Sequence, residues 1–168
     1  MHEAYLSLGS NLGDREAALR GAIEQLRQLE CTEVSAVSSF YESSPVGFVS
    51  AQWFLNCAVR ILTRLPPPVL LDECERIEAL FGREKQRGRR GEPGDRALDI
   101  DLILYEELTL FTWRLQIPHP EATRRLFVLL PLAELEPEIR LGEHTVEEWA
   151  ELTRAEHPEQ QVRLYRSG

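Results

Sequence analysis

Apolar residues recur at the spacing of an amphipathic α-helix in two parts of the chain. Over residues 14–29 and again over residues 66–81 they fall three or four positions apart, which places them on one face. Asp14 is a suitable N-cap for the first helix, and the prolines at 66–68 suit the first turn of the second. The pattern therefore predicts two helices, and Gly82 is placed to end the second one.

Apolar and polar residues alternate in four further segments, which predicts β-strands. These segments are residues 4–8, 34–41, 54–62 and 98–105. In the last segment, the apolar face is predicted to carry Leu98, Ile100, Leu102 and Leu104. Its other face carries Asp99 and Asp101, and Phe54 and Asn56 share one face of the third strand. Each of these strands therefore has one face suited to a core and one face that carries polar groups.

The predicted order, β-α-β-β-α-β, is the signature of a ferredoxin-like α+β fold. We expect a single domain over residues 1–168, with a mainly antiparallel sheet and the helices on one face. The polar strand faces then converge on the opposite side, where a ligand would bind. The C-terminal additions are predicted as a helix over 121–135 interrupted near Pro131, a helix over 145–156 and an edge strand over 161–165.

Composition narrows the possible partners. The 168 residues include 19 Lys and Arg but 28 Asp and Glu, a net charge of −9, whereas a general nucleic-acid binder is usually basic. Residues 83–96 instead hold six cations and three acids, which suit a compact phosphorylated ligand or form a solvated loop. No apolar run has the length of a membrane span, and the first residues lack the features of a signal peptide, so we expect a cytoplasmic protein. Three widely spaced cysteines fit neither a disulfide framework nor a zinc site.

The most specific local feature is Asp99-Ile100-Asp101. Asp99 and Asp101 lie two residues apart on a strand, so their backbones are about 6.6 Å apart and their carboxylates point the same way. They repel each other unless a cation or water screens both. Mg²⁺ prefers oxygen ligands of this kind and keeps positions open for phosphate oxygens. The pair is therefore either a metal site for phosphoryl transfer or a solvent-facing strand edge.

Three other features have both a functional and a structural interpretation. Residues 9–13, between a strand and a helix, form an anion site or only a turn. His119, held between two prolines, donates to a phosphate or has a structural role. Phe54 and Phe127 are stacking platforms or core residues, and Asn56 near Phe54 can recognise the edge of a heterocycle.

In this order along the chain, these residues resemble the motifs of the 6-hydroxymethyl-7,8-dihydropterin pyrophosphokinase family, over roughly residues 4–137. The matching segments are Leu8-Gly9-Ser10-Asn11-Leu12-Gly13-Asp14-Arg15, Tyr41-Glu42-Ser43-Ser44-Pro45-Val46-Gly47, Phe54-Leu55-Asn56, Ile77-Glu78 with Gly82-Arg83, Arg96-Ala97-Leu98-Asp99-Ile100-Asp101-Leu102-Ile103-Leu104, and Pro118-His119-Pro120 through Arg125-Leu126-Phe127-Val128-Leu129. One such segment is weak support, but together and in register they are specific.

The resemblance implies an enzyme of folate biosynthesis that uses two Mg²⁺ ions. It would transfer the intact pyrophosphoryl group of ATP to the hydroxymethyl oxygen of the pterin and release AMP. By position, Asp99 and Asp101 would hold the metal, and with Arg83 and Arg96 they would be the catalytic residues. The implied ATP-binding positions are Glu75, Arg83, Arg96, Leu102, Arg114, Gln116, His119 and Arg125. The implied pterin-binding positions are Ser43, Ser44, Pro45, Val46, Phe54, Asn56 and Phe127.

The chain departs from many relatives just before the aspartates. It reads Arg89-Arg90-Gly91-Glu92-Pro93-Gly94-Asp95-Arg96-Ala97-Leu98-Asp99, where many relatives have R-W-G-P-R-T-L-D. Arg96 therefore matches directly, whereas Arg87, Arg89 and Arg90 are not assigned to individual contacts.

Two other classes of function compete with the enzyme. An RNA-binding ferredoxin-like module should be basic, with aromatic and basic motifs on its central strands. In an interaction domain, the paired aspartates would be only a polar edge. We expect neither of these classes. We expect a monomeric enzyme that binds ATP and the pterin but binds no nucleic acid and no membrane. We also expect that none of its cysteines takes part in catalysis.

Overall fold

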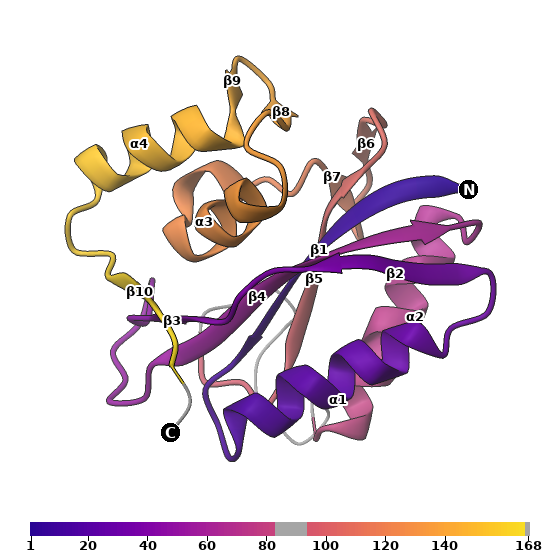
Figure 1. The fold of residues 1–168 in the computed structure, drawn as a ribbon, viewed down its shortest axis with the longest axis horizontal. Coiled ribbons are helices and arrows are strands. Elements are labelled where there is room, and N and C mark those ends of the chain that lie inside the picture. The colour runs from indigo at the N-terminus through magenta and orange to yellow at the C-terminus, as the bar shows by residue number, and fades with distance from the viewer. Residues whose placement is uncertain (83–93, 167–168) are drawn as a thin grey trace.

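A six-stranded antiparallel sheet forms the centre of the computed structural model, which describes residues 1–82 and 94–166 (Figure 1). Its strands are β1 (His2–Ser10), β2 (Thr32–Val37), β3 (Tyr41–Ser43), β4 (Phe54–Thr63), β5 (Asp99–Tyr105) and β10 (Val162–Leu164). The order across the sheet is β10-β3-β4-β1-β5, and β2 also pairs with β4. The predicted α+β class, the antiparallel sheet and the C-terminal edge strand are thus confirmed.

The segment predicted as one strand over residues 34–41 is instead two strands. β2 pairs with the second half of β4, and β3 pairs with its first three residues. Between them the chain departs from strand pairing at Ser38, whose Oγ accepts a hydrogen bond from the Ala58 N–H at 2.8 Å. The alternation of side chains cannot reveal such a break, because both strands border the same partner strand.

Helices α1 (Arg15–Arg27) and α2 (Pro67–Leu80) cover one face of the sheet, as predicted (Figure 1). Asp14 is the N-cap of α1 and accepts a hydrogen bond from the Ala17 N–H at 3.0 Å. The apolar stripes of both helices pack on the sheet in one core, in which Leu19 and Ile77 are fully buried. Burial of each such side chain stabilises the fold by about 1.5–3 kcal/mol.

The C-terminal additions cover part of the opposite face. They comprise the hairpin of β6 (Leu110–Phe111) and β7 (Gln116–Ile117), the 3₁₀ turn η2 (Ala122–Arg124), α3 (Leu126–Leu135), the hairpin of β8 (Arg140–Leu141) and β9 (His144–Thr145), and α4 (Val146–Glu156). α3 packs on β4 and on α4, and together they bury a second apolar cluster. Only the remainder of this face is therefore open to a ligand.

The predicted interruption near Pro131 is wrong, because α3 continues through Pro131 and the chain instead bends at Arg125, before the helix begins. A proline inside a helix costs about 3 kcal/mol. Val128, Leu129 and Leu132 are buried on this helix, and at about 1.5–3 kcal/mol each their burial exceeds that cost.

A second correction concerns Leu104. The pairing of β1 with β5 shifts register between Tyr5 and Leu6, which pair with Leu104 and Leu102 respectively. Ile103 is therefore an extra residue, and Leu104 packs in the cluster below α3 rather than against α1 and α2. The bulge has a consequence for the site, because the Ile103 carbonyl accepts a hydrogen bond from the His119 N–H at 3.0 Å.

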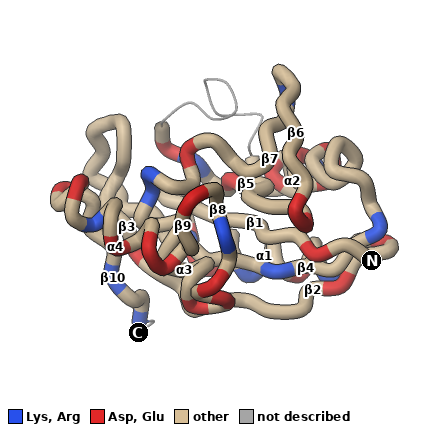
Figure 2. The backbone as a smooth tube through the Cα atoms, turned by 90° about the horizontal axis from the view of Figure 1, so that it is seen from above, with Lys and Arg blue, Asp and Glu red and all other residues tan. Residues whose placement is uncertain are grey.

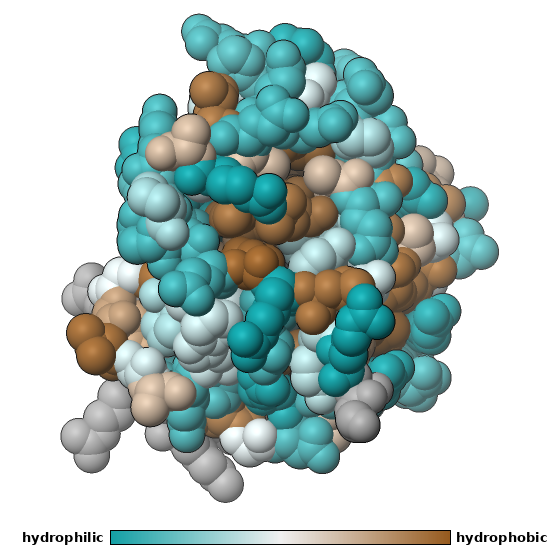
Figure 3. Space-filling view, turned by 60° about the vertical axis from the view of Figure 1, so that its left-hand side comes forward, coloured by the Kyte–Doolittle hydropathy of each residue, from teal (hydrophilic) through white to brown (hydrophobic). Residues whose placement is uncertain are grey.

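Charged residues are distributed along the described part of the chain rather than gathered in one element (Figure 2). On the side that carries β3 and β10, apolar residues occupy the middle of the face and hydrophilic residues surround them (Figure 3). Within residues 1–82 and 94–166, no helix combines the length and the hydropathy needed to cross a membrane.

Candidate active site

Three neighbouring strands align the candidate residues in two rows across the open part of the sheet. Gly9 of β1 is paired with Asn56 of β4 on one side and with Asp99 of β5 on the other. Two residues earlier in β1, Ser7 is paired with Asp101. Because directly paired residues of antiparallel strands point to the same face, the sheet brings the amide and both carboxylates together.

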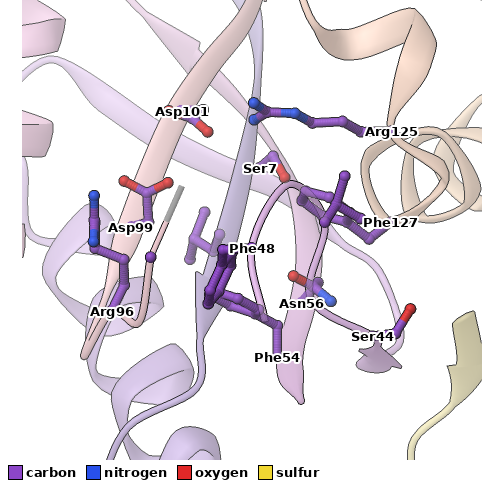
Figure 4. A pocket seen from close by; sticks show the side chains of 14 residues that line it. Ser7, Ser44, Phe48, Phe54, Asn56, Arg96, Asp99, Asp101, Arg125 and Phe127 are labelled. Atoms are coloured by element: carbon purple, nitrogen blue, oxygen red, sulfur yellow. The ribbon is translucent and has the colours of Figure 1, made fainter. Parts of the chain in front are cut away.

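These rows form the floor of a cleft. Its lining residues are Ser7, Leu8, Gly9, Ser44, Val46, Phe48, Phe54, Asn56, Gly94, Arg96, Asp99, Asp101, Arg125 and Phe127. In Figure 4, Arg96, Asp99 and Asp101 lie on one side, and the aromatic side chains of Phe48, Phe54 and Phe127 lie toward the other. The cleft thus combines a charged end with an aromatic end.

Gly9 allows this close arrangement. A Cβ atom at this position would lie 3.1 Å from Asn56 Oδ1 and 3.7 Å from Phe54 Cδ2. Gly9 and Ser10 were expected in a turn, but both belong to β1. The sequence motifs did not reveal this role of Gly9, because the role depends on the close approach of a neighbouring strand. The only sign of it in the sequence is that residue 9 has no side chain.

Asn56 is held rigidly in the floor of the cleft. It is 1% exposed, and its Nδ2 donates hydrogen bonds to Ser43 Oγ at 2.7 Å and to the Tyr41 carbonyl at 3.4 Å. Its Oδ1 lies next to Gly9. Ser43 is itself buried behind Asn56 rather than among the lining residues, and Pro45 also lies outside the lining, between Ser44 and Val46.

Asn11 connects the end of β1 to the start of β5. Its Oδ1 accepts a hydrogen bond from the Arg96 N–H at 2.7 Å, and its own N–H donates to the Arg96 carbonyl at 2.9 Å. Its Nδ2 also donates to Asp95 Oδ1 at 2.8 Å. Within the segment expected to be an anion site or a turn, residues 11–13 leave the strand and bend, and Asn11 there anchors Arg96, which is buried in the wall of the cleft.

A second pocket adjoins the charged end of the cleft. Its lining residues are Leu71, Glu75, Asp101, Leu102, Trp113, Arg114, Leu115, Gln116, His119 and Pro120. Asp101 belongs to both pockets, so the cleft and the second pocket meet at this carboxylate. Five of the predicted nucleotide-binding residues line this pocket. They come from separate parts of the chain, namely α2, β5 and the segment that follows β5.

Hydrogen bonds orient two side chains in the second pocket. Arg114 forms ion pairs with Asp72 and Glu75 of α2. His119 Nδ1 accepts a hydrogen bond from the Glu121 N–H at 3.1 Å. In the neutral ring, the proton therefore lies on Nε2, which makes this nitrogen the donor.

Glu78 is a further buried carboxylate close to the site. It is 1% exposed, and its Oε2 accepts a hydrogen bond from the Ile100 N–H at 2.7 Å. Ile100 lies between the two aspartates, so Glu78 holds the backbone that carries them. Arg83, together with Arg87, Arg89 and Arg90, lies outside the described residues.

Similarity to known proteins defines the class of this chain, which is an ATP-dependent transferase that acts on a small molecule. Residues 5–137 match the family of 7,8-dihydro-6-hydroxymethylpterin-pyrophosphokinases (HPPK), and the chain belongs to this family. Its activity is pyrophosphoryl transfer from ATP to hydroxymethyldihydropterin in folate synthesis. This confirms the family and the function that the sequence motifs implied.

Two curated relatives match this chain over about nine tenths of their own length. The chain is 44% identical over 148 residues to a 2-amino-4-hydroxy-6-hydroxymethyldihydropteridine pyrophosphokinase of Methylorubrum extorquens, covering 88% of this chain and 91% of that protein. It is 40% identical over 163 residues to the protein of the same name from Bacillus subtilis, covering 97% and 90%.

Solved structures share the fold at lower identity. A crystal structure of an HPPK-DHPS protein in complex with substrates superimposes with a TM-score of 0.73 at 13% identity, over 94% of this chain and 44% of that one. The wild-type HPPK-DHPS of Plasmodium falciparum gives a TM-score of 0.72 at 15% identity, over 95% and 45%. This chain thus spans less than half of those two chains.

Proposed function

We propose that the aromatic end of the cleft binds the pterin. The flat bicyclic ring would lie between Phe54 and Phe127, which suits two aromatic faces. Asn56 Oδ1 would accept a hydrogen bond from the ring edge, because Nδ2 is held by Ser43. Ser43 thereby positions the amide, and the segment from Ser44 to Val46 lies beside the ring.

We propose that the second pocket binds the nucleotide of ATP. Leu102 supplies apolar contact, and Glu75, Arg114 and Gln116 supply polar groups near it. The triphosphate would extend toward Asp101, where Arg96 and Arg125 of the cleft and Nε2–H of His119 can bind its oxygens. Arg83 is proposed as a further phosphate ligand.

Asp99 and Asp101 are proposed as the magnesium ligands. Both carboxylates line the cleft from one face of β5, and their hard oxygen atoms are the ligands that Mg²⁺ prefers. When bound, two Mg²⁺ ions would neutralise the phosphate oxygens. Arg96 would add a permanent positive charge beside them, so that charge neutralisation and positioning supply most of the rate.

A single observation carries the proposal: Asp101 lines both pockets. A pterin in one pocket and ATP in the other would therefore meet at this carboxylate. The hydroxymethyl oxygen could then form a bond to the β-phosphorus as the bond to the α,β-bridging oxygen breaks, and AMP would leave. We propose that the chain does this as a monomeric single domain in the cytoplasm, without nucleic acid.

Turnover by an Asp101→Asn variant tests this proposal. With ATP, Mg²⁺ and the hydroxymethyl dihydropterin, mass spectrometry should detect AMP and the pterin diphosphate for the wild-type chain. The variant should lose roughly 100-fold or more in kcat, while Glu107→Gln, which removes an exposed carboxylate just beyond the other end of β5, should keep full activity. Undiminished turnover by Asp101→Asn, or ADP in place of AMP, would refute the proposal.

A further inference from the structure

A tryptophan stands almost fully exposed at the tip of the β6–β7 hairpin. Trp113 is 95% exposed, yet it lines the second pocket together with the apolar side chains of Leu71, Leu102 and Leu115. The hairpin projects from the body of the protein on the side of β5 and α2 (Figures 1 and 2). An indole in this position keeps a large apolar surface in water, which contact with a ligand would remove.

The tip of the hairpin is held firmly beside the pocket. The N–H and Oγ1 of Thr112 both donate to the Leu115 carbonyl, at 2.9 and 3.0 Å, and the Leu115 N–H donates back to Thr112 Oγ1 at 3.0 Å. Trp113 and Arg114 therefore occupy the centre of a closed turn. The ion pairs of Arg114 with Asp72 and Glu75 tie this turn to α2.

We propose that Trp113 stacks on the base of the bound nucleotide. The proposal rests on the placement of ATP in this pocket, which is itself proposed above. The purine base is the flat, aromatic part of ATP, and its face can contact an indole, whereas the triphosphate cannot. The leucines that line the pocket offer apolar contact to the rest of the base, and the Gln116 amide can bind its edge.

The phosphates are proposed to lie where the second pocket meets the cleft, because Asp101 lines both and Arg96 and Arg125 line the cleft, whereas Trp113 is not among the residues that line the cleft. Trp113 should therefore affect the base without affecting the phosphates. A ligand that carries the phosphates but no base separates these two contributions.

Isothermal titration calorimetry on the intact chain tests the proposal with two probes. The first is α,β-methylene ATP with Mg²⁺, in which the bond to be broken is replaced, and the second is inorganic tripolyphosphate with Mg²⁺. Trp113→Ala should weaken binding of the nucleotide analogue by roughly 5- to 150-fold, the range that base stacking gives. It should leave binding of tripolyphosphate within twofold of wild type.

Two further variants control for the aromatic ring and for the hairpin. Trp113→Phe should restore most of the affinity for the analogue, because a flat ring is retained. Phe111→Ala removes a ring that is 82% exposed in the same hairpin but outside the pocket lining, and should leave affinity unchanged. The proposal would be overturned if Trp113→Ala bound the nucleotide analogue within twofold of wild type, or if it lost equal affinity for tripolyphosphate. It would also be overturned if Phe111→Ala lost as much affinity for the analogue as Trp113→Ala, or if Trp113→Phe recovered none of it. A wild-type chain that bound neither probe would instead refute the placement of ATP.

Discussion

Replacement of Gly9 by alanine should weaken pterin binding while the fold and ATP binding are preserved. Gly9 lies within β1 and is not among the glycines with positive φ, so its backbone conformation accepts an alanine. The added methyl carbon would lie 3.1 Å from Asn56 Oδ1, a few tenths of an ångström closer than an ordinary contact. Asn56 cannot retreat easily, because it is 1% exposed and its Nδ2 is bonded to Ser43 Oγ at 2.7 Å.

The expected loss follows from the hydrogen bonds of this amide. Either the bond to Ser43 or the proposed bond to the pterin edge must lengthen, and a compromised buried hydrogen bond costs about 1–3 kcal/mol. This corresponds to roughly a 5- to 150-fold rise in the Kd of the pterin. Calorimetric titration of the pterin in the presence of α,β-methylene ATP measures the loss, and titration of the analogue alone shows whether nucleotide binding is retained.

A double-mutant cycle with Asn56→Ala provides the control. In the Asn56→Ala background the carboxamide is gone, so the methyl group of Gly9→Ala should add much less than it does in the wild-type chain. Equal effects in both backgrounds, unchanged pterin binding, or an equal loss of affinity for the nucleotide would refute the reasoning.

Two further predictions concern titratable groups. Burial alone would raise the pKa of Glu42, but hydrogen bonds from Arg15 and Arg163 outweigh it and lower this pKa below its ordinary value. Glu42→Gln should therefore lower the free energy of unfolding by about 1 kcal/mol at pH 7. This difference between variant and wild type should vanish as the pH falls through the lowered pKa of Glu42, because the carboxylate is then protonated. Urea unfolding that gives the same difference at pH 7 and at pH 3 would contradict this prediction. Burial also raises the pKa of Cys57 to about 12, whereas Cys31 is exposed. At pH 8 a thiol reagent should therefore modify only Cys31 of the folded chain, without loss of activity. Modification of further cysteines before the chain unfolds would count against this prediction.

Local sequence patterns predicted the elements that are regular over their whole length. The stripe of α1 repeats over several turns, and Asp14 caps it by a bond three residues away, so the information needed lies within the helix itself. The patterns failed where a distant segment sets the geometry. The break at Ser38 depends on β4, the bulge at Ile103 depends on β1, and the continuation through Pro131 depends on burial against β4 and α4.

The residues of the candidate site also fall into two groups, those that local motifs identify and those whose roles only the tertiary structure shows. The motifs named Asp99, Asp101 and Asn56, and strand alternation put both aspartates on one face. They did not reveal that Gly9 lies between Asn56 and Asp99, or that Asn11 anchors the segment before the aspartates. Such roles depend on side chains of other strands, which a local pattern does not contain.

By itself, the sequence determined the α+β class, the order of the principal strands and helices, and the family, because these depend on local periodicity and on residue types in a fixed order. The tertiary structure alone decided that two pockets meet at Asp101 and that Phe127 and Trp113 reach them from α3 and from the β6–β7 hairpin. The physical reason is that strand register and the packing of distant segments place these side chains, and both arise from contacts between residues far apart in the chain.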